Sequence, residues 1–411
     1  MTQRVFHFRG ATLALQDYNF RWFMLARILA TATIQMRNVG SGWLIYHLTD
    51  SALALGWVAA AKGLTILITS PLGGVFTDRF EKRTILVWTR VVWTLSAFAV
   101  ALLIYFDVIR VWHMVLVYIV DGVVIAFMMP AQDTIISDLV DRKTLLNAVS
   151  LNFVSQGLMG IFGALAAGYL IESAGPAGVY LGMGLLFSMV TFALLKLPKG
   201  GIVSDTQPVT LAQVYGRLVE GLRHVWHSST LLTLILMGVT FGFFTQSYRT
   251  FLPAFARDDL FLSAVGLGIL TAAVDAGALT NSLVATLLGD SAHKGKLYLG
   301  SGILGGVCLI LLANFQLSPA PFVLMFLIGA LGNMIQVMNM TLLQSHCDLN
   351  MRGRVFSISY LLRGLAPVWL VAAGTLAEWW GVPLVFTVMG VVLVAIYLAI
   401  AAFRPGIWRL R

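Results

Sequence analysis

The chain has 411 residues, of which 59% are hydrophobic and only 11% are charged, and its formal net charge is +9. A mean hydropathy of +0.87 excludes an ordinary soluble domain, in which about a quarter of the residues are charged. The apolar runs reach roughly 20 residues, enough for a helix to cross the ~30 Å hydrocarbon core of a bilayer and too long for barrel strands of about 10 residues. We therefore predict an all-α integral membrane protein, because helices satisfy their own backbone polar groups in lipid.

The predicted elements begin after an N-terminal stretch, MTQRVFHFRGATLALQDYNF, that lacks a compact apolar run with a small-residue cleavage site. No removed signal peptide is expected there. Charged or turn-rich breaks then divide the chain into twelve apolar segments. These segments begin near residues 20, 52, 84, 110, 146, 176, 229, 262, 296, 319, 354 and 382. The pattern predicts twelve transmembrane helices.

A long polar stretch separates the sixth segment from the seventh. We predict an N-terminal six-helix bundle over 1–196, a cytoplasmic central loop over 197–228 and a C-terminal six-helix bundle over 229–411. Within the loop, QPVTLAQVYGRLVEGLRHVW carries Leu211, Val214, Leu218 and Leu222 on one helix face, which predicts an amphipathic helix on the membrane surface. A tether between the bundles is the favoured role for this helix, and regulation is the alternative.

Basic residues collect on one side of the membrane when both termini are placed in the cytoplasm. Twenty lysines and arginines then lie inside, including Arg90 and the three basic residues before it, whereas Arg110 and Arg257 lie outside. The positive-inside rule predicts this orientation. Topology and contact with anionic membrane lipids account for the positive charge, so nucleic acid is not an expected partner.

The two halves of the chain align with each other. At a shift of 212 residues the matches include Thr33 with Thr245, Arg37 with Arg249, Gly56 with Gly268, Asp78 with Asp290 and Lys82 with Lys294. At a shift of 206, Gly168 meets Gly374 and Glu172 meets Glu378. Ordered matches at turns and buried charges indicate a duplication. The duplication predicts two pseudo-symmetric six-helix bundles in parallel orientation. Transporters have this arrangement, with cargo held between the bundles near the midplane.

The stretch GGVFTDRFEKR, between the second and third segments, carries the spacing Gly74-x-x-x-Asp78-Arg79-x-x-Lys82-Arg83. Together with MMPAQDTIISDLVDRKTLLNAVSLN and LLQSHCDLNMRGRVFSISYLLRG, it resembles the major facilitator superfamily over essentially the whole chain, in the branch of enterobactin-exporter-like and macrolide-efflux-like proteins. This resemblance implies the major facilitator fold. Exporters of this branch commonly show Gly-Pro in the fifth helix, whereas this chain has GALAAG with Ala164 in the place of the proline. The departure weakens the support for export by antiport.

The resemblance also implies that the signature loop is a gate latch. An aspartate at Asp78 would cap the cytoplasmic N-terminus of the eleventh helix, where the helix dipole is positive. The basic residues beside it would bridge to an acid at the inner end of the fourth helix, either Asp133 or Asp138. The residues assigned to the latch and to its weaker copy in the second half are Gly74, Asp78, Arg79, Lys82, Arg83, Asp133, Asp290 and Lys294. The alternative is a topological role, in which positive charge pins a short loop inside.

Several charged residues fall inside the predicted spans: Arg27, Arg37, Lys62, Arg249, Arg363, Asp121, Asp133 and Asp275. A charge at the bilayer centre costs at least about 2.5–3.5 kcal/mol, so each requires a partner or water. We predict an Arg37–Asp121 pair, because these residues lie at similar depth, and we expect Lys62 to meet Asp275. One interpretation makes the pairs purely structural. The other makes Asp121 or Asp275 a proton carrier, because a desolvated carboxyl group holds a proton more readily.

The tenth segment contains GNMIQVMNMTLLQ, with amides recurring every three residues on one helix face. These amides serve either helix packing or contact with cargo. The candidate cargo residues are Arg37, Lys62, Arg249, Asn333, Gln336, Asn339 and Arg363. Aromatic residues near the span ends, such as Tyr46, Trp379 and Trp380, are expected to anchor the helices at the membrane interface.

The sequence shows no nucleotide-binding G-x-x-x-x-G-K-[ST], no G-x-S-x-G nucleophile motif and no metal-ligand spacing, so we expect neither an enzyme nor a cofactor. Cys308 and Cys347 do not indicate a disulfide framework. We predict a monomeric secondary active transporter in the inner or plasma membrane of a prokaryote, exporting a small amphiphilic drug or siderophore-like molecule by proton antiport. The alternatives are an importer, symporter or facilitator of a small polar or anionic solute and, more remotely, a membrane scaffold or lipid-acting enzyme.

Overall fold

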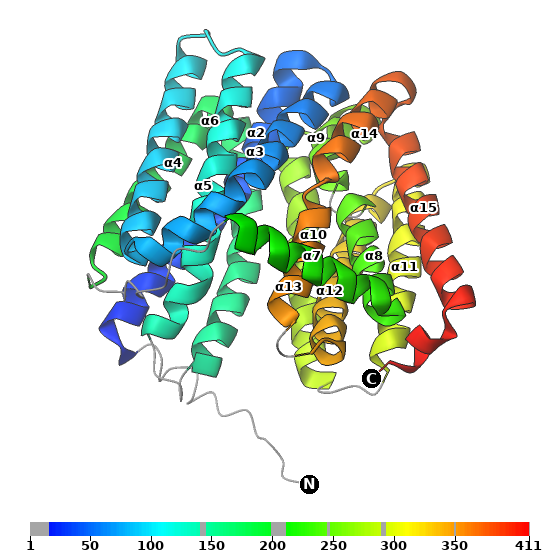
Figure 1. Ribbon diagram of the computed structural model, residues 1–411. Coiled ribbons are helices and arrows are strands. Elements are labelled where there is room, and N and C mark those ends of the chain that lie inside the picture. The colour runs from blue at the N-terminus through cyan, green and yellow to red at the C-terminus, as the bar shows by residue number, and fades with distance from the viewer. Residues whose placement is uncertain are drawn as a thin grey trace. The chain divides into compact units, whose positions relative to one another are not determined.

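The computed structural model describes residues 16–139, 145–198, 211–244, 247–288, 293–348 and 351–410. Throughout these ranges the regular structure is helical, without a strand (Figure 1). Nine helical segments in the described ranges are long and apolar enough to cross a membrane. The prediction of an all-α integral membrane protein is therefore confirmed.

The N-terminal half supplies the first six spans. Its helices are α2 (Tyr18–Thr49), α3 (Ala52–Arg79), α4 (Lys82–Tyr105), α5 (Val111–Leu139) and α6 (Leu145–Leu195). The 51 residues of α6 would extend about 76 Å as one straight helix, more than twice the hydrocarbon thickness. Gly175 interrupts α6 with a φ of 69°, a conformation that glycine adopts readily, and Pro176 starts the following helical part. Thus α6 contains both the fifth and the sixth predicted spans.

The C-terminal half supplies the other six spans. Its helices are α7 (Leu211–His227), α8 (Ser229–Phe244), α9 (Tyr248–Ala254), the π-helical turn η2 (Phe255–Asp259), α10 (Ala264–Leu288), α11 (Lys294–Asn314), α12 (Ala320–His346), α13 (Arg352–Arg363), α14 (Ala366–Trp380), α15 (Val382–Phe403) and the short η3 (Pro405–Arg409). The seventh span comprises α8, α9 and η2. The eleventh is divided into α13 and α14, with Pro367 in the first turn of α14, where proline is tolerated. The element starts agree with the twelve predicted starts to within a few residues.

The chain forms two compact units. Unit 1 contains Met1–Ser41 and Ile68–Thr206, and unit 2 contains Gly42–Leu67 and Gln207–Arg411. The end of α2, the turn after it and the first part of α3 therefore pack with C-terminal helices. The domain boundaries at residues 196 and 228 stay predictions.

Within unit 1, α4 packs against α5 and α6 around a core that includes Phe20, Phe23, Trp93 and Phe187. The opposite face of α4 exposes Trp88, Leu95 and Leu102, seven residues apart, with exposed fractions of 65%, 63% and 55%. Large apolar side chains exposed along one stripe suit contact with lipid, because they would be costly to expose to water. The buried face of α4 is thereby fixed, and it carries the polar residues described below.

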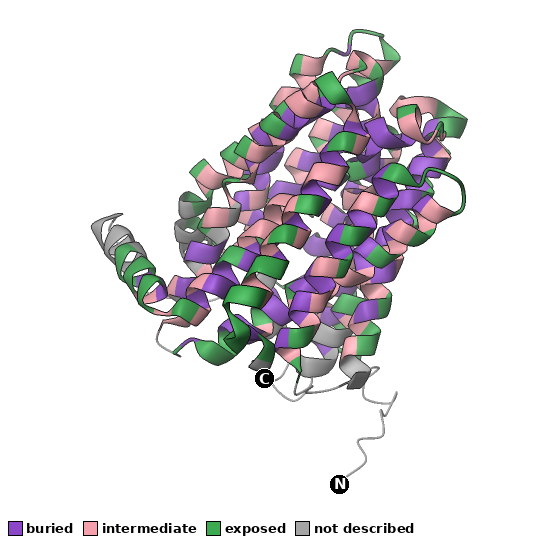
Figure 2. Ribbon diagram, turned by 90° about the vertical axis from the view of Figure 1, so that its right-hand side faces the viewer, coloured by how far each residue is buried: buried purple, intermediate pink, exposed green. Residues whose placement is uncertain are grey.

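Within unit 2, α10 packs against α12, and α11 packs against both α12 and α15. Glycines bring the first pair together: a Cβ added at Gly329 would lie 2.0 Å from the carbonyl oxygen of Val274. Close backbone approach through small residues is typical of helix pairs in membranes. Exposed residues, green in Figure 2, recur along single helix faces, as they do on α15 at Leu384, Val391 and Leu398.

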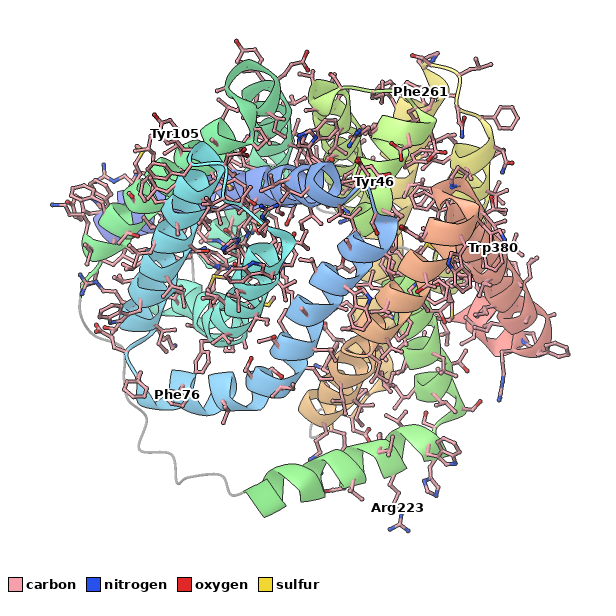
Figure 3. The ribbon with its side chains drawn as sticks, turned by 90° about the horizontal axis from the view of Figure 1, so that it is seen from above. Tyr46, Phe76, Tyr105, Arg223, Phe261 and Trp380 are labelled. Atoms are coloured by element: carbon pink, nitrogen blue, oxygen red, sulfur yellow. The ribbon has the colours of Figure 1, made fainter. Side chains whose placement is uncertain are left out.

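The predicted amphipathic helix of the central loop is present as α7. It packs against α13, burying Val225, while Glu220 forms an ion pair with Arg354. The other side of α7 exposes Leu222 and Trp226, and Arg223 extends away from the helix (Figure 3). An apolar stripe exposed beside basic residues fits the predicted position on a membrane surface.

Candidate functional site

An ion pair is buried inside unit 1, between α2 and α5. Asp121 Oδ1 accepts a hydrogen bond from Arg37 Nη1 at 2.6 Å. The two side chains are only 8% and 2% exposed, Arg37 being the more exposed. The Arg37–Asp121 pair predicted from the sequence is therefore confirmed. Pairing is what makes two charges tolerable at this depth, because an isolated charge in a dry interior is strongly disfavoured.

Two further polar side chains adjoin this pair on the buried face of α4. The Arg37 guanidinium carbon lies 4.3 Å from the centroid of the Trp93 ring, and that of Arg90 lies 4.7 Å from the same ring. Arg90 donates from Nη2 to Gln132 Oε1 at 3.1 Å and is only 2% exposed. The sequence-based count placed Arg90 with the cytoplasmic charges, although the third span was predicted to begin near residue 84. The helix already begins at Lys82, so Arg90 lies more than two turns inside α4.

The repeat mate of Arg37 forms the second ion pair, within unit 2. Arg249 Nη2, on α9, donates to Asp275 Oδ1, on α10, at 3.2 Å. This pair is more accessible than the first, with side-chain exposures of 38% and 14%. The structure thus gives Asp275 the partner Arg249, and the expected contact between Lys62 and Asp275 stays a prediction.

The amides of the tenth span lie on α12. Asn339 is buried and donates from Nδ2 to Leu234 O at 2.8 Å and to the Tyr298 hydroxyl at 2.6 Å. Asn333 Oδ1 accepts from Asn281 Nδ2 at 2.8 Å. These two amides connect neighbouring helices, the packing role considered for them, whereas Gln336 is exposed. Their contact with cargo stays a prediction.

The turn between α2 and α3 forms a polar cluster within unit 2, which we call the turn cluster. It consists of Tyr46, Asp50, Ser51, Arg257, Asp258 and Glu378. The Tyr46 hydroxyl donates to Asp258, and Arg257 Nη1 donates to Asp50 Oδ1 at 2.7 Å. Tyr46 is 6% exposed, so its expected role as an interfacial anchor is wrong.

Glu378 caps the N-terminus of α3 in this cluster. Its Oε2 accepts from Leu53 N at 3.2 Å and from Ser51 Oγ at 2.9 Å. A carboxylate placed there satisfies backbone N–H groups that have no partner in their own helix and interacts favourably with the helix dipole. Sequence analysis marked Glu378 only as a repeat mate of Glu172. Nothing in the local sequence around either end of this contact indicates it.

The predicted gate latch is described only in part. Gly74, Asp78 and Arg79 lie in the last turns of α3, and Lys82 begins α4. Arg83 donates from Nε to Leu194 O at 3.2 Å and from Nη2 to Leu195 O at 2.7 Å, so it binds the last carbonyls of α6. Asp290 lies outside the described residues, as do the side chains of Asp78, Arg79, Asp133 and Arg363. Lys294 begins α11.

Metal chemistry finds no support in the described ranges, where no group of three or more His, Cys, Asp or Glu side chains gathers. Helical spans that carry buried ion pairs and polar clusters define a multi-pass membrane protein. The chain matches the family described as transmembrane secretion effector over residues 10–407. It belongs to that family, within the major facilitator superfamily, as its signature loop indicated.

Named relatives are distant but extend along most of the chain. The chain is 24% identical to the uncharacterized MFS-type transporter YfiS of Bacillus subtilis (strain 168), covering 85% of this chain and 84% of that protein. It is 23% identical to the enterobactin exporter EntS of Shigella flexneri, covering 94% of this chain and 93% of that protein.

Solved structures with the same fold share still less sequence. The nucleoside transporter NupG matches with a TM-score of 0.71 at 14% identity, covering 94% of this chain and 98% of that one. A bacterial homolog to the human lysosomal transporter Spinster, in an inward-facing and unoccupied conformation, matches with a TM-score of 0.73 at 13% identity, covering 95% and 98%. The predicted major facilitator fold is confirmed, and the family consists of transporters rather than enzymes.

Proposed function

We propose that the protein exports a small amphiphilic molecule, drug-like or siderophore-like, from a prokaryotic cell by proton antiport. The family description and the similarity to an exporter support the direction of transport. The observation that carries proton coupling is the Arg249–Asp275 pair, an ion pair on membrane-spanning helices whose two side chains stay partly exposed.

Asp275 is the better proton carrier of the two candidate acids. A carrier must exchange protons with water and must change its contacts when it is protonated. Asp275 is 14% exposed and lies 3.2 Å from its arginine, whereas Asp121 is 2% exposed and lies 2.6 Å from its own. Protonation of Asp275 would weaken its attraction to Arg249 and free that guanidinium for cargo. Asp121 would instead fix the relative positions of α2 and α5.

Proton release from energised inside-out membrane vesicles tests this assignment. Amphiphilic drugs and dyes are added one at a time to wild type, Asp275→Asn and Asp121→Asn, with Asp107→Asn as the control at an exposed turn. We expect one or more compounds to release protons in wild type and in Asp107→Asn, and none to do so in Asp275→Asn. Cargo movement that releases protons equally in Asp275→Asn would refute the carrier assignment.

Accumulation in whole cells tests the direction. Expression of an exporter lowers the internal level of its cargo, whereas expression of an importer or facilitator, the alternative within this class, raises it or leaves it at equilibrium. The same compounds are used in both assays, so that a compound shown to move protons is also assigned a direction.

We also propose that the signature loop acts as a gate latch. Asp78 adds nothing to topology, which argues for a role beyond pinning the loop inside. Asp78→Asn is expected to reduce transport strongly at unchanged expression, and near-normal transport by this variant contradicts the latch. The proposed arrangement is a monomer in the inner membrane with both termini cytoplasmic. A fluorescent protein fused to the C-terminus should then fluoresce, and a periplasmic phosphatase fused there should be inactive.

A further inference from the structure

Hydrogen-bond donors without acceptors gather at one place in unit 1. Five buried side-chain nitrogen or oxygen atoms of the described residues have no hydrogen-bond partner, and three of them belong to Arg90 (Nε and Nη1) and Trp93 (Nε1). Both side chains are 2% exposed, and both lie on the buried face of α4. Buried polar atoms in proteins are nearly always paired, so such a group requires an explanation.

The depth of these donors makes their lack of acceptors unfavourable. Arg90 lies eight residues after the start of α4, about 12 Å along the helix axis, and so within the depth of the hydrocarbon core. A buried donor without a partner has given up its hydrogen bond to water and gained none, and the loss is greater for a charged donor. The Trp93 ring offsets part of this through its contact with the guanidinium, but a ring face accepts no conventional hydrogen bond from Nε or Nη1.

The charges around Arg90 favour an anionic ligand. Two cations, Arg27 and Arg37, lie close enough to act on it electrostatically. Asp121 is paired with Arg37, and the side chain bound by Arg90 itself is the neutral Gln132. A network built only for stability would place a second acid beside Arg90, because buried like charges repel one another and a buried charge is tolerated when it is paired.

We propose that Arg90 and Trp93 bind an oxyanion group, of the carboxylate or phosphate type, on the transported molecule. This assignment rests on the proposed function and makes the substrate class a small organic anion. An oxyanion fits because arginine offers planar, charge-assisted N–H donors matched to such groups, and the indole N–H adds a further donor beside them. It would accept from one edge of the Arg90 guanidinium, through Nε or Nη1, because these two N–H groups point away from each other, and it would reduce the excess positive charge.

Thermal unfolding of the purified protein in an uncharged detergent tests the binding directly. Sodium benzoate and sodium phosphate are titrated against sodium chloride at equal ionic strength. A ligand that binds only the folded state raises Tm as its concentration rises. We expect at least one of the two anions to raise the Tm of wild type more than chloride does. If neither does so, the proposal is overturned.

Three variants separate binding from structure. Arg90→Gln removes the charge and should weaken the apparent anion affinity about ten- to a hundredfold, the loss expected for hydrogen bonds to a charged group. Trp93→Phe keeps the ring and removes one donor, so it should weaken binding less. Arg21→Gln makes the same charge change at an exposed position of α2 and should bind like wild type. An anion-dependent rise in Tm that persists unchanged in Arg90→Gln overturns the proposal.

Without added anion, Arg90→Gln supplies an independent readout. A binding residue that is unpaired in the empty protein destabilises it, so the variant should unfold at the same temperature as wild type or a higher one. A marked fall in the Tm of the anion-free variant indicates a structural role and contradicts the assignment.

Uptake of labelled benzoate into inside-out vesicles then distinguishes the two proposals. Anion binding in detergent without benzoate uptake by wild type would refute the transport of this anion and leave the binding site standing. Transport of benzoate by Arg90→Gln at the wild-type rate and half-saturation would refute the site and leave the transport function standing.

Discussion

Neutralising Asp121 should destabilise the protein strongly. In wild type, the Asp121 carboxylate lies 2.6 Å from the Arg37 guanidinium, and the Arg37 side chain is 8% exposed. In Asp121→Asn, this guanidinium stays buried without its carboxylate. Two unit charges about 4 Å apart attract by about 4 kcal/mol at an effective dielectric constant of about 20. Removing one member of a buried pair costs about 3–5 kcal/mol by experience with other proteins. We therefore expect Asp121→Asn to lower the free energy of unfolding by about 3 kcal/mol or more.

The assay is unfolding in mixed micelles, in which SDS is titrated against a mild detergent. Asp107→Asn is the matched control, because Asp107 is exposed and its φ of 56° is tolerated by asparagine. It should change the free energy of unfolding by no more than about 0.5 kcal/mol. Arg37→Gln completes a double-mutant cycle. The double variant has neither charge of the pair, so no unpaired charge of this pair is left buried. Its loss in the free energy of unfolding should therefore be about 2 kcal/mol smaller than the sum of the two single losses. A loss below about 1 kcal/mol in Asp121→Asn, with additive effects in the double variant, would show that the pair does not hold α2 and α5 together.

Three other changes test separate features. Glu378→Ala should lower the free energy of unfolding by about 0.5–1 kcal/mol, as loss of an N-terminal cap does, and an unchanged denaturation curve would contradict the cap on α3. Gly329→Ala places a Cβ 2.0 Å from a backbone carbonyl oxygen of α10 and should greatly reduce the folded yield. Gly300→Ala is the control and should express normally, because a Cβ there has no other atom within 4 Å. Equal yields of the two variants would contradict the close helix contact. Burial raises the pKa of the Cys347 thiol. In a Cys308→Ala background, the rate of maleimide labelling should therefore still rise above about pH 9, where the labelling of an ordinary exposed thiol levels off. A labelling rate that reaches its plateau below about pH 9 would contradict the raised pKa.

The spans could be predicted from the sequence because hydropathy is a local property, and twelve apolar runs require twelve crossings. The Arg37–Asp121 pair was equally accessible, since two opposite charges at one depth have few alternatives. Arg90 was counted with the cytoplasmic charges, although the third span was predicted to begin near residue 84. It follows a dense run of loop charges, and sequence alone does not show that its side chain is buried and bonded to Gln132 of α5.

Contacts between distant segments could not be predicted. The bond from Leu53 N to Glu378 joins residues 325 positions apart, and neither position carries a local signal for it. Asp275 illustrates the same limit: its need for a cation was evident, but two cations in neighbouring spans qualified, and only the folded structure shows Arg249 beside it. Sequence reasoning therefore identified which groups require partners more readily than it identified the partners.

The membership of the α2–α3 turn in unit 2 has a consequence for biosynthesis. The ribosome makes this hairpin before the residues that hold it: Asp258 and Glu378 emerge 212 and 327 positions after Tyr46 and Ser51. Until then its polar turn lacks these partners. Maturation of this hairpin must wait for α14, so termination before Glu378 would damage the α2–α3 turn as well as the helices that are missing. Quality control that recognises an unclosed N-terminal hairpin would detect truncated copies of this transporter.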